Sequence, residues 1–249
     1  MHSIFGAKHL IILAISLAAM VFGVLFARKW SIQKLAKTML GIGLASEFIK
    51  IFYYIIANEA THGGVLPKTD LPFHLCSIQL IFMAVLVFSA NQRLKQLLIS
   101  FMIPSCLFGG IAALLIATTS SLNGGWILSV QYFGYHVAIS VFALSLLLGK
   151  EHTLTVQGYV DCLKFLVGLA LFAVYINSVL YNGVSNINFM YVVSPPQSGL
   201  PFLTEEYGWA VYICHYSFTV VFCVTLCYIK PIVLAIKEKC SRCKKCAVG

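Results

Sequence analysis

The chain has 249 residues, of which 60% are hydrophobic and only 10% are charged, and its formal net charge is +9 at pH 7. Soluble domains carry about 25% charged and about 45–50% apolar residues, so this composition excludes an ordinary soluble globule and indicates a bilayer as the solvent. Because one spanning helix needs about 20 mainly apolar residues, the length suffices for about seven spans joined by short loops. The sequence therefore predicts an all-α, polytopic protein of the cell membrane.

Seven apolar runs follow one another along the chain, separated by charged or Gly-, Asn- and Ser-rich breaks. The first ends in the basic stretch "ARKW" without a small-residue cleavage site, so we interpret it as a retained span and not as a removed signal peptide. The predicted spans cover residues 10–27, 38–58, 71–90, 96–117, 126–149, 159–182 and 208–236. Residues 1–236 then form one transmembrane domain, a bundle of seven helices. Residues 237–249 form a basic, Cys-containing tail that we expect to be unstructured.

The distribution of Lys and Arg predicts the orientation of these spans. One set of loops holds seven of these residues and the C-terminal end on the same side, from Lys230 onward, holds six, whereas the opposite side holds only Lys8 and Lys68. Since cytoplasmic loops are enriched in Lys and Arg, the N-terminus is predicted to lie outside and the tail in the cytoplasm. The basic residues are then expected to meet anionic lipid headgroups at the cytoplasmic face, and the net charge does not require a nucleic-acid partner.

The nine cysteines lack the setting of a disulfide scaffold, and most of them lie in apolar runs, where cysteine behaves as a small hydrophobic residue. The tail residues Cys240, Cys243 and Cys246 lack the second cysteine pair, or the histidines, of a zinc ribbon. We therefore expect neither a metal nor another cofactor.

Polar side chains inside the predicted spans are costly, and they indicate a functional site by default. With the predicted orientation and a rise of about 1.5 Å per residue, nearly all of them lie in the outer half of a hydrocarbon core about 30 Å thick. This shared depth predicts one polar cavity that opens outward. The residues are Glu47, Lys50, His74, Cys76, Gln79, Gln131, His136, Asn177 and His215.

Helical spacing divides this set further. Glu47 and Lys50 are three residues apart, so they can pair with each other. The pair is either a structural ion pair or it presents a cation, Lys50, to the cavity. At the start of the third span, Asp70 is predicted to be the N-cap. His74 and Cys76 are two residues apart and point to different faces, whereas Cys76 shares a face with Gln79.

Cys76 is the candidate nucleophile. A thiol near a helix N-terminus and a cation favours the thiolate, and a thiolate beside an imidazole can carry out acyl transfer. Because His74 points elsewhere, the imidazole would come from another helix, as His136 or His215. The competing interpretation is a small apolar cysteine packed between helices, with a histidine that bonds a neighbouring helix.

The stretch "LPFHLC", residues 71–76, resembles the LPxHLC motif of the YwaF family of bacterial integral membrane proteins, whose animal relative is transmembrane protein 164. Two more stretches are similar, "QYFGYHVAIS" at residues 131–140 and "NINFMYV" at residues 186–192, although the second departs from the more usual Gly-Thr-Asn-Tyr-Met pattern. The resemblance covers most of the chain and implies seven spans. The animal relative is an acyltransferase for lyso-ether phospholipids, which implies catalytic roles for Cys76 and His136.

Two functions from different classes follow. The first is transfer or hydrolysis of an acyl chain of a membrane phospholipid or another acyl lipid, with Cys76 as nucleophile and His136 as base. The residues expected to bind the substrate are Glu47, Lys50, His74, Gln79, Asn177 and His215. The second function is transport or binding of a small molecule in the same cavity, with Glu47, His136 and His215 as proton or substrate ligands.

Overall fold

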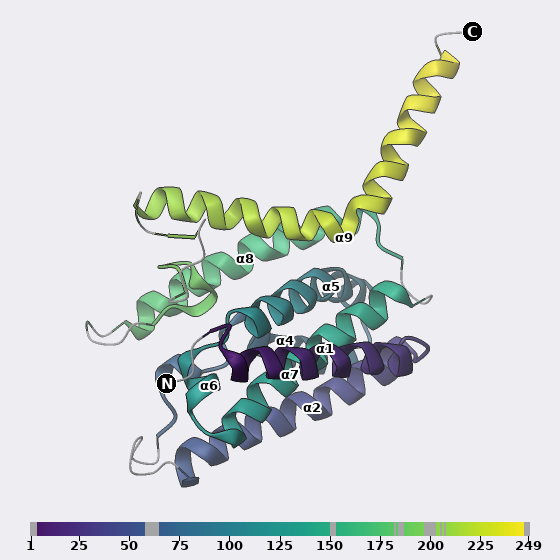
Figure 1. Cartoon of the computed structure of the whole chain (residues 1–249). Helices are drawn as coiled ribbons and strands as arrows, with labels where there is room; N and C mark the ends of the chain where they lie inside the picture. The colour runs from purple at the N-terminus through teal and green to yellow at the C-terminus, as the bar shows by residue number, and fades with distance from the viewer. Residues whose placement is uncertain are drawn as a thin grey trace.

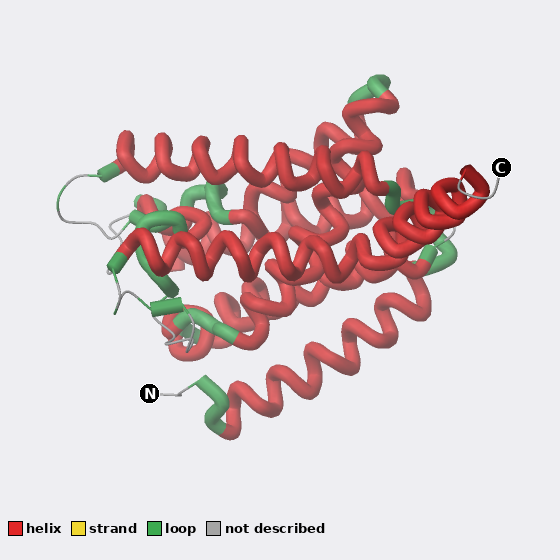
Figure 2. Tube along the Cα trace, turned by 90° about the horizontal axis from the view of Figure 1, so that it is seen from above, coloured by secondary structure: helices red, strands yellow, loops and turns green. Residues whose placement is uncertain are grey.

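The computed structural model describes residues 4–57, 65–149, 153–181, 183, 187–196, 203–204, 206 and 208–246. Every regular element within these residues is helical (Figure 2). The longer helices are α1 (Ala7–Ala27), α2 (Ile32–Phe52), α4 (Leu75–Phe88), α5 (Gln92–Leu115), α7 (Trp126–Leu148), α8 (Val156–Leu180) and α9 (Trp209–Cys246). The short elements are the π-helical turn η1 (Tyr53–Ala57), the 3₁₀ turns η2 (Lys68–Asp70) and η3 (Phe189–Tyr191), and the helix α6 (Thr119–Asn123). The prediction of an all-helical membrane protein is confirmed for this part of the chain.

Each predicted span overlaps one of the longer helices, but the helices are not equal in length. Six of them are long and apolar enough to cross a membrane, whereas α4 has only 14 residues. At about 1.5 Å per residue, α4 is about 21 Å long, which is less than a hydrocarbon core of about 30 Å. The protein is therefore multi-pass, while the seventh crossing and the orientation of the termini stay predictions.

The start of α4 differs from the predicted position. Asp70 is not its N-cap, because Asp70 ends η2 and the N-cap is His74. The cause is Pro72, whose ring disfavours helical dihedral angles in the preceding residue; Leu71 is accordingly extended, with φ −61° and ψ 150°. A backbone hydrogen bond across Pro72 closes a tight turn before the helix begins. Cys76 is consequently the second residue of α4.

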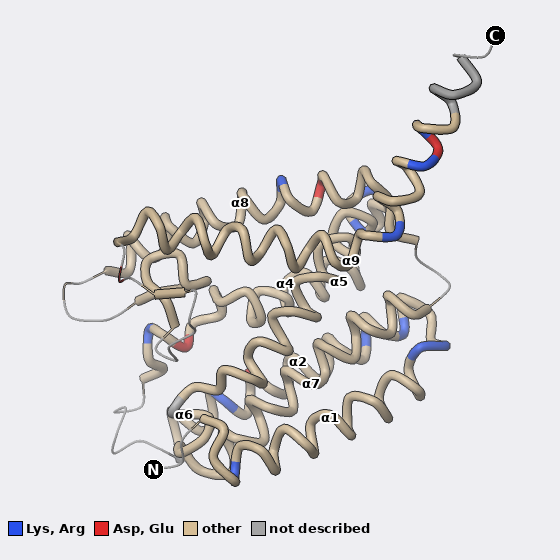
Figure 3. The backbone as a smooth tube through the Cα atoms, turned by 45° about the horizontal axis from the view of Figure 1, so that its top comes forward, with Lys and Arg blue, Asp and Glu red and all other residues tan. Residues whose placement is uncertain are grey.

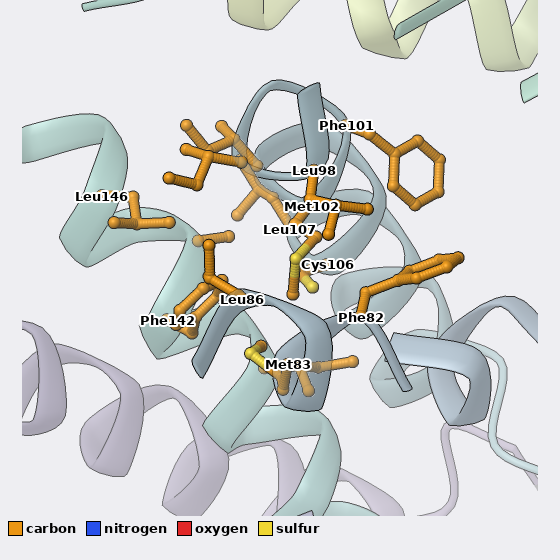
Figure 4. Close-up of a cluster of buried hydrophobic side chains, with 14 of the residues drawn as sticks. Phe82, Met83, Leu86, Leu98, Phe101, Met102, Cys106, Leu107, Phe142 and Leu146 are labelled. Atoms are coloured by element: carbon orange, nitrogen blue, oxygen red, sulfur yellow. The ribbon is translucent and has the colours of Figure 1, made fainter. Parts of the chain in front are cut away.

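Helix α5 lies at the centre of the bundle (Figure 1). It packs against α4, α7, α8 and α9, and α7 in turn contacts α1 and α2. The main hydrophobic core fills the space between α4, α5 and α7, where aromatic and aliphatic side chains interdigitate (Figure 4). Phe101, Cys106 and Phe142 are completely buried there. Large apolar side chains on α1, α8 and α9 are instead exposed, as expected of helices that face lipid.

Polar caps and basic residues gather at one end of the bundle. Helices α2, α5 and α8 begin there with Ser31, Asn91 and Thr155, each of which accepts a hydrogen bond from a first-turn N–H. Lys and Arg cluster at this end, where α1 ends and the arm of α9 leaves the bundle (Figure 3). Helices α1, α4 and α7 begin at the opposite end, and their N-caps make no side-chain hydrogen bond. The first N–H groups of α4 are therefore not covered by the side chain of its own N-cap.

Helix α9 bends and continues past its internal proline, Pro231 (Figure 1). A proline inside a helix removes one backbone hydrogen bond and displaces the preceding turn, which explains the bend. Beyond it the helix runs to Cys246, so the expectation of an unstructured tail is wrong for residues 237–246. This basic segment is a helical arm that projects from the bundle.

Candidate functional site

Cys76 lies in the first turn of α4 and is half-buried. Its thiol contacts the Ser77 hydroxyl at a long Sγ–Oγ distance of 4.0 Å. Its backbone carbonyl accepts a 2.8 Å hydrogen bond from the Tyr135 hydroxyl of α7. The residues within electrostatic range of the thiol include Lys50, Cys106, Tyr132, Tyr135 and Tyr191. Side chains from α2, α5, α7 and the η3 loop thus surround the start of α4.

His136 is the buried histidine of α7. Its Nδ1 atom lies 2.7 Å from the carbonyl oxygen of Tyr132, one helical turn earlier. Because a carbonyl oxygen only accepts hydrogen bonds, Nδ1 carries the proton and Nε2 presents a lone pair. The buried Nε2 atom has no hydrogen-bond partner among the described residues. The ring is therefore held in the tautomer whose second nitrogen can accept a proton.

His74 joins the start of α4 to the η3 loop. Its ring packs edge-on against Phe189 at a centroid distance of 5.1 Å and lies 5.7 Å from the ring of Tyr191. Burial, and then the positive charge of Lys50, lower the pKa of His74 to about 4. The imidazole is therefore neutral at physiological pH, and it acts as an aromatic contact. It also lies within electrostatic range of His136.

Lys50 of α2 is buried and fully engaged with neighbouring groups. Its Nζ atom lies 2.8 Å from Glu47 Oε2, and it donates to Glu47 Oε1 and to the Asp70 backbone carbonyl, each at 2.9 Å. Of the two interpretations left open by the sequence, the structure contains the ion pair. Lys50 also ties α2 to the 3₁₀ turn η2, so it stabilises the chain segment that precedes α4 and Cys76.

Gln79 lies one turn after Cys76 on the same face of α4 and is completely buried. Its Nε2 atom donates to the Leu75 carbonyl at 3.1 Å and to the Ser105 hydroxyl of α5 at 3.0 Å. Ser105 in turn donates to a carbonyl of its own helix, which makes its oxygen the acceptor from Gln79. The Oε1 atom of Gln79 has no partner among the described residues. Gln79 therefore presents a buried acceptor, while its amide protons are engaged.

Asn177 of α8 holds the η3 loop through two hydrogen bonds. Its buried side-chain amide donates to the Phe189 carbonyl at 3.2 Å and accepts from the Phe189 N–H at 2.8 Å. A single side chain therefore satisfies both backbone groups of one loop residue. In this structure Asn177 positions the segment that packs against His74.

His215 lies apart from the other predicted residues. Its side chain is exposed on α9. Within the described part of the chain, His215 has no hydrogen bond or ring contact with any other predicted site residue. Cys76, His74, Gln79, His136 and the Lys50 pair lie around the start of α4. Within the part of the chain that the structure describes, no group of three or more His, Cys, Asp and Glu side chains is placed to hold a metal ion.

Three tyrosines near Cys76 are absent from the residues predicted by sequence. Tyr135 and Tyr132 precede His136 by one and four residues, and Tyr191 ends η3. All three lie in the two stretches "QYFGYHVAIS" and "NINFMYV", so the stretches themselves were a signal. Helical periodicity alone does not show which of their hydroxyl groups reach α4, because that depends on how distant segments pack.

The fold and this site define a polytopic helical membrane protein whose polar residues meet where a short helix begins inside the bundle. Comparison with protein-family models matches residues 4–228 to the TMEM164 family, and the chain belongs to this family. The match extends from the start of α1 to the last residues of α9 before its bend, and it confirms the resemblance seen in the sequence. No curated protein and no solved structure matches the chain.

Proposed function

We propose that this protein transfers or hydrolyses the acyl chains of membrane lipids, with Cys76 as nucleophile and His136 as general base and acid. The observation that carries the proposal is the state of the His136 ring. Nδ1 is bound to the Tyr132 carbonyl, and Nε2 is buried without a partner among the described residues. An imidazole that is oriented through one nitrogen and free at the other is suited to general-base catalysis.

Two features favour Cys76 as the partner of this base. The Tyr135 hydroxyl bonds the Cys76 carbonyl, and this brings the start of α4 against the turn of α7 that carries His136. Cys76 also lies in the first turn of its helix, where the helix dipole stabilises the thiolate once His136 has accepted the proton. The thiol and Nε2 are not hydrogen-bonded in this structure. Such hydrogen bonds often tighten only in the complex with substrate.

The proposed reaction has two half-reactions. In the first, His136 Nε2 accepts the thiol proton, the Cys76 sulfur bonds to the ester carbonyl carbon, and the carbonyl electron pair moves to oxygen. When that pair returns, the ester C–O bond breaks, the leaving alkoxide takes the proton from Nε2, and a thioester remains on Cys76. In the second, Nε2 accepts a proton from a lipid hydroxyl or water as its oxygen attacks the thioester carbonyl; the C–S bond then breaks, and the leaving Cys76 thiolate takes the proton back from Nε2. A lipid hydroxyl gives transfer, and water gives hydrolysis.

The contacts that the residues around Cys76 already make limit the role that each of them could have in binding a substrate. Lys50 is already paired with Glu47, and a neutral His74 offers no charge to a headgroup phosphate. The Oε1 atom of Gln79 is a buried acceptor on the face of Cys76, and it suits the hydroxyl of an acyl acceptor. The apolar side chains exposed on α1, α8 and α9 suit contact with the chains of a lipid substrate.

The test compares the wild-type protein with Cys76→Ala, Cys76→Ser and His136→Gln in phospholipid vesicles. We expect each variant to lose at least about 100-fold in the rate of acyl exchange or release, followed by mass spectrometry of the lipids. Cys214→Ser is the matched control, because Cys214 is an exposed free cysteine on α9. Unchanged acyl chemistry in both Cys76 variants would sink the mechanism.

The transport alternative needs Glu47, His136 and His215 to act together. In this structure Glu47 is paired with Lys50 and His215 is exposed on α9, so neither joins His136. Uptake of a solute that survives Cys76→Ala but fails in Glu47→Gln would favour transport over acyl chemistry.

A further inference from the structure

The proposed acyl reaction needs a hydrogen-bond donor for the negative charge that develops on the carbonyl oxygen. The donors predicted from the sequence are engaged. Lys50 is bound to Glu47 and to a backbone carbonyl. The amide nitrogen of Gln79 already donates hydrogen bonds to α4 and α5, and only its oxygen, which is an acceptor, is left without a partner among the described residues. The first N–H groups of α4, which the N-cap side chain leaves uncovered, are backbone donors beside Cys76, and a side-chain donor has to come from another residue.

Three tyrosines lie within electrostatic range of the Cys76 thiol, and two of them already donate elsewhere. Tyr132 donates to the Ala113 carbonyl at 3.1 Å, and Tyr135 donates to the Cys76 carbonyl at 2.8 Å. The hydroxyl of Tyr191 has no hydrogen-bond partner among the described residues. Tyr191 is thus the phenol in this group whose proton is still available.

The backbone that carries Tyr191 is held in an unusual conformation. Met190 and Tyr191 have φ values of 56° and 54°, in the left-handed region that residues with a Cβ atom rarely adopt. Such a conformation persists only where the surrounding structure enforces it, and it is characteristic of functional sites. Here the enforcing contacts come from two helices: Asn177 of α8 binds both backbone groups of Phe189, Tyr216 of α9 donates to the Met190 carbonyl at 2.8 Å, and Tyr212 of α9 donates to the Tyr191 carbonyl.

The ring of Tyr191 is fixed on its other side by the approach to α4. It lies 5.7 Å from the ring of His74, the residue that caps the helix in which Cys76 lies. The neighbouring Phe189 packs against the same imidazole at 5.1 Å. Hydrogen bonds from α8 and α9 therefore hold the backbone around Tyr191, and His74 contacts its ring. A donor placed in this way before substrate binds needs no reorganisation during the reaction.

We propose that Tyr191 is the oxyanion donor of the site: its phenolic O–H donates a hydrogen bond to the carbonyl oxygen of the acyl ester while Cys76 attacks. The proposal rests on the acyl chemistry proposed above and adds a catalytic residue to it. The proton stays on Tyr191 throughout, and the hydrogen bond strengthens as the oxygen becomes negative. Burial, and then the nearby Cys76 thiol, raise the pKa of Tyr191, which keeps the phenol protonated near neutral pH.

The experiment uses the full chain in vesicles of phosphatidylcholine, with p-nitrophenyl decanoate as the probe ester. Tyr191→Phe removes the hydroxyl and keeps the ring against His74. Tyr175→Phe is the matched control, because Tyr175 is 63% exposed on α8. Cys76→Ala is the reference for the loss of the nucleophile. Rates are normalised to the folded fraction measured by circular dichroism.

We expect kcat of Tyr191→Phe to fall roughly 100- to 1,000-fold with little change in KM, because an oxyanion donor acts in the transition state and not on the bound ester. A kcat for Tyr191→Phe equal to that of Tyr175→Phe, with Cys76→Ala inactive, overturns the role of Tyr191 alone. A fall in rate that only follows the loss of folded protein, or that lies entirely in KM, also overturns it. A wild-type rate equal to that of Cys76→Ala overturns the acyl chemistry and with it this role.

Discussion

The Tyr135 hydroxyl donates a 2.8 Å hydrogen bond to the backbone carbonyl of Cys76, which couples the first turn of α4 to the turn of α7 that carries His136. The bond uses the main chain of the candidate nucleophile and leaves its thiol free of this contact. Because Tyr135 and His136 are successive residues of one helix, their relative positions are fixed by the helix geometry. The proposed base and the proposed nucleophile thus lie on two helices that this hydrogen bond joins.

Replacement of this tyrosine gives the first prediction. Tyr135→Phe should lower the free energy of unfolding by about 1 kcal/mol, because one interhelical hydrogen bond is lost and the ring is kept. The variant should also raise the rate at which a maleimide labels Cys76, since the start of α4 is less firmly held. Unfolding is followed by denaturant titration in detergent micelles. Tyr181→Phe, at an exposed position after α8, is the control. Labelling that is as slow as in wild type would contradict the coupling.

The buried ion pair gives the second prediction. Lys50→Met leaves Glu47 without its partner, and the free energy of unfolding should fall by about 2–4 kcal/mol. The side chains of Lys50 and Glu47 are only 10% and 21% exposed, so water replaces the lost contact poorly. The double variant Glu47→Gln/Lys50→Met should recover most of this loss, because it leaves no charge uncompensated.

The same double variant separates a structural role of Lys50 from substrate binding. If the pair only ties α2 to the turn before α4, the refolded double variant should keep the rate and the KM of acyl release. A large increase in KM with unchanged stability would instead assign the Lys50 charge to the headgroup of the substrate. The rate measurements and the denaturation curves are made on the same preparations.

Asn177 gives the third prediction. Asn177→Ala removes two hydrogen bonds from the backbone of Phe189, and the variant should be about 2–3 kcal/mol less stable than wild type. The loop at residues 187–196 should become more sensitive to limited proteolysis, and the cut sites are mapped by mass spectrometry. Ser178→Ala is the control, because the exposed Ser178 hydroxyl bonds only within its own helix. Equal protection of the loop in both variants would show that Asn177 does not hold it.

The longer helices were predictable from sequence because each one overlaps a mainly apolar run in the sequence. At the start of α4, Pro72 forces Leu71 into an extended conformation, and the helix begins four residues later than the N-cap Asp70 would place it. In the tail, the expectation of an unstructured segment is wrong for residues 237–246, because they continue the helix α9 through Cys246.

The candidate site was predictable only in part. The i, i+3 spacing places Cys76 and Gln79 on one face of α4, whereas His74 precedes the helix as its N-cap and helical spacing does not describe it. The hydrogen bonds of Tyr135 to Cys76 and of Tyr212 to the η3 loop join residues 59 and 21 positions apart, respectively. Such contacts depend on how α4, α7 and α9 pack, and a pattern read along one segment does not contain that information.

The fourth prediction concerns pH and rests on His74. Burial, and then Lys50, depress its pKa from 6.5 to about 4 in the folded protein, so the unfolded chain binds more protons between these values. Stability contributed by this neutral imidazole is therefore fully present above about pH 6.5 and is lost as the pH falls toward about 4.

His74→Phe keeps an aromatic ring against Phe189 and removes the titration. The melting temperature of the wild type should thus decrease more steeply than that of His74→Phe between pH 6.5 and pH 4, measured by circular dichroism in detergent micelles. His215→Phe, at an exposed position on α9, is the control for the replacement of a histidine by phenylalanine. Parallel curves for the wild type and His74→Phe would show that His74 is not held neutral at the start of α4.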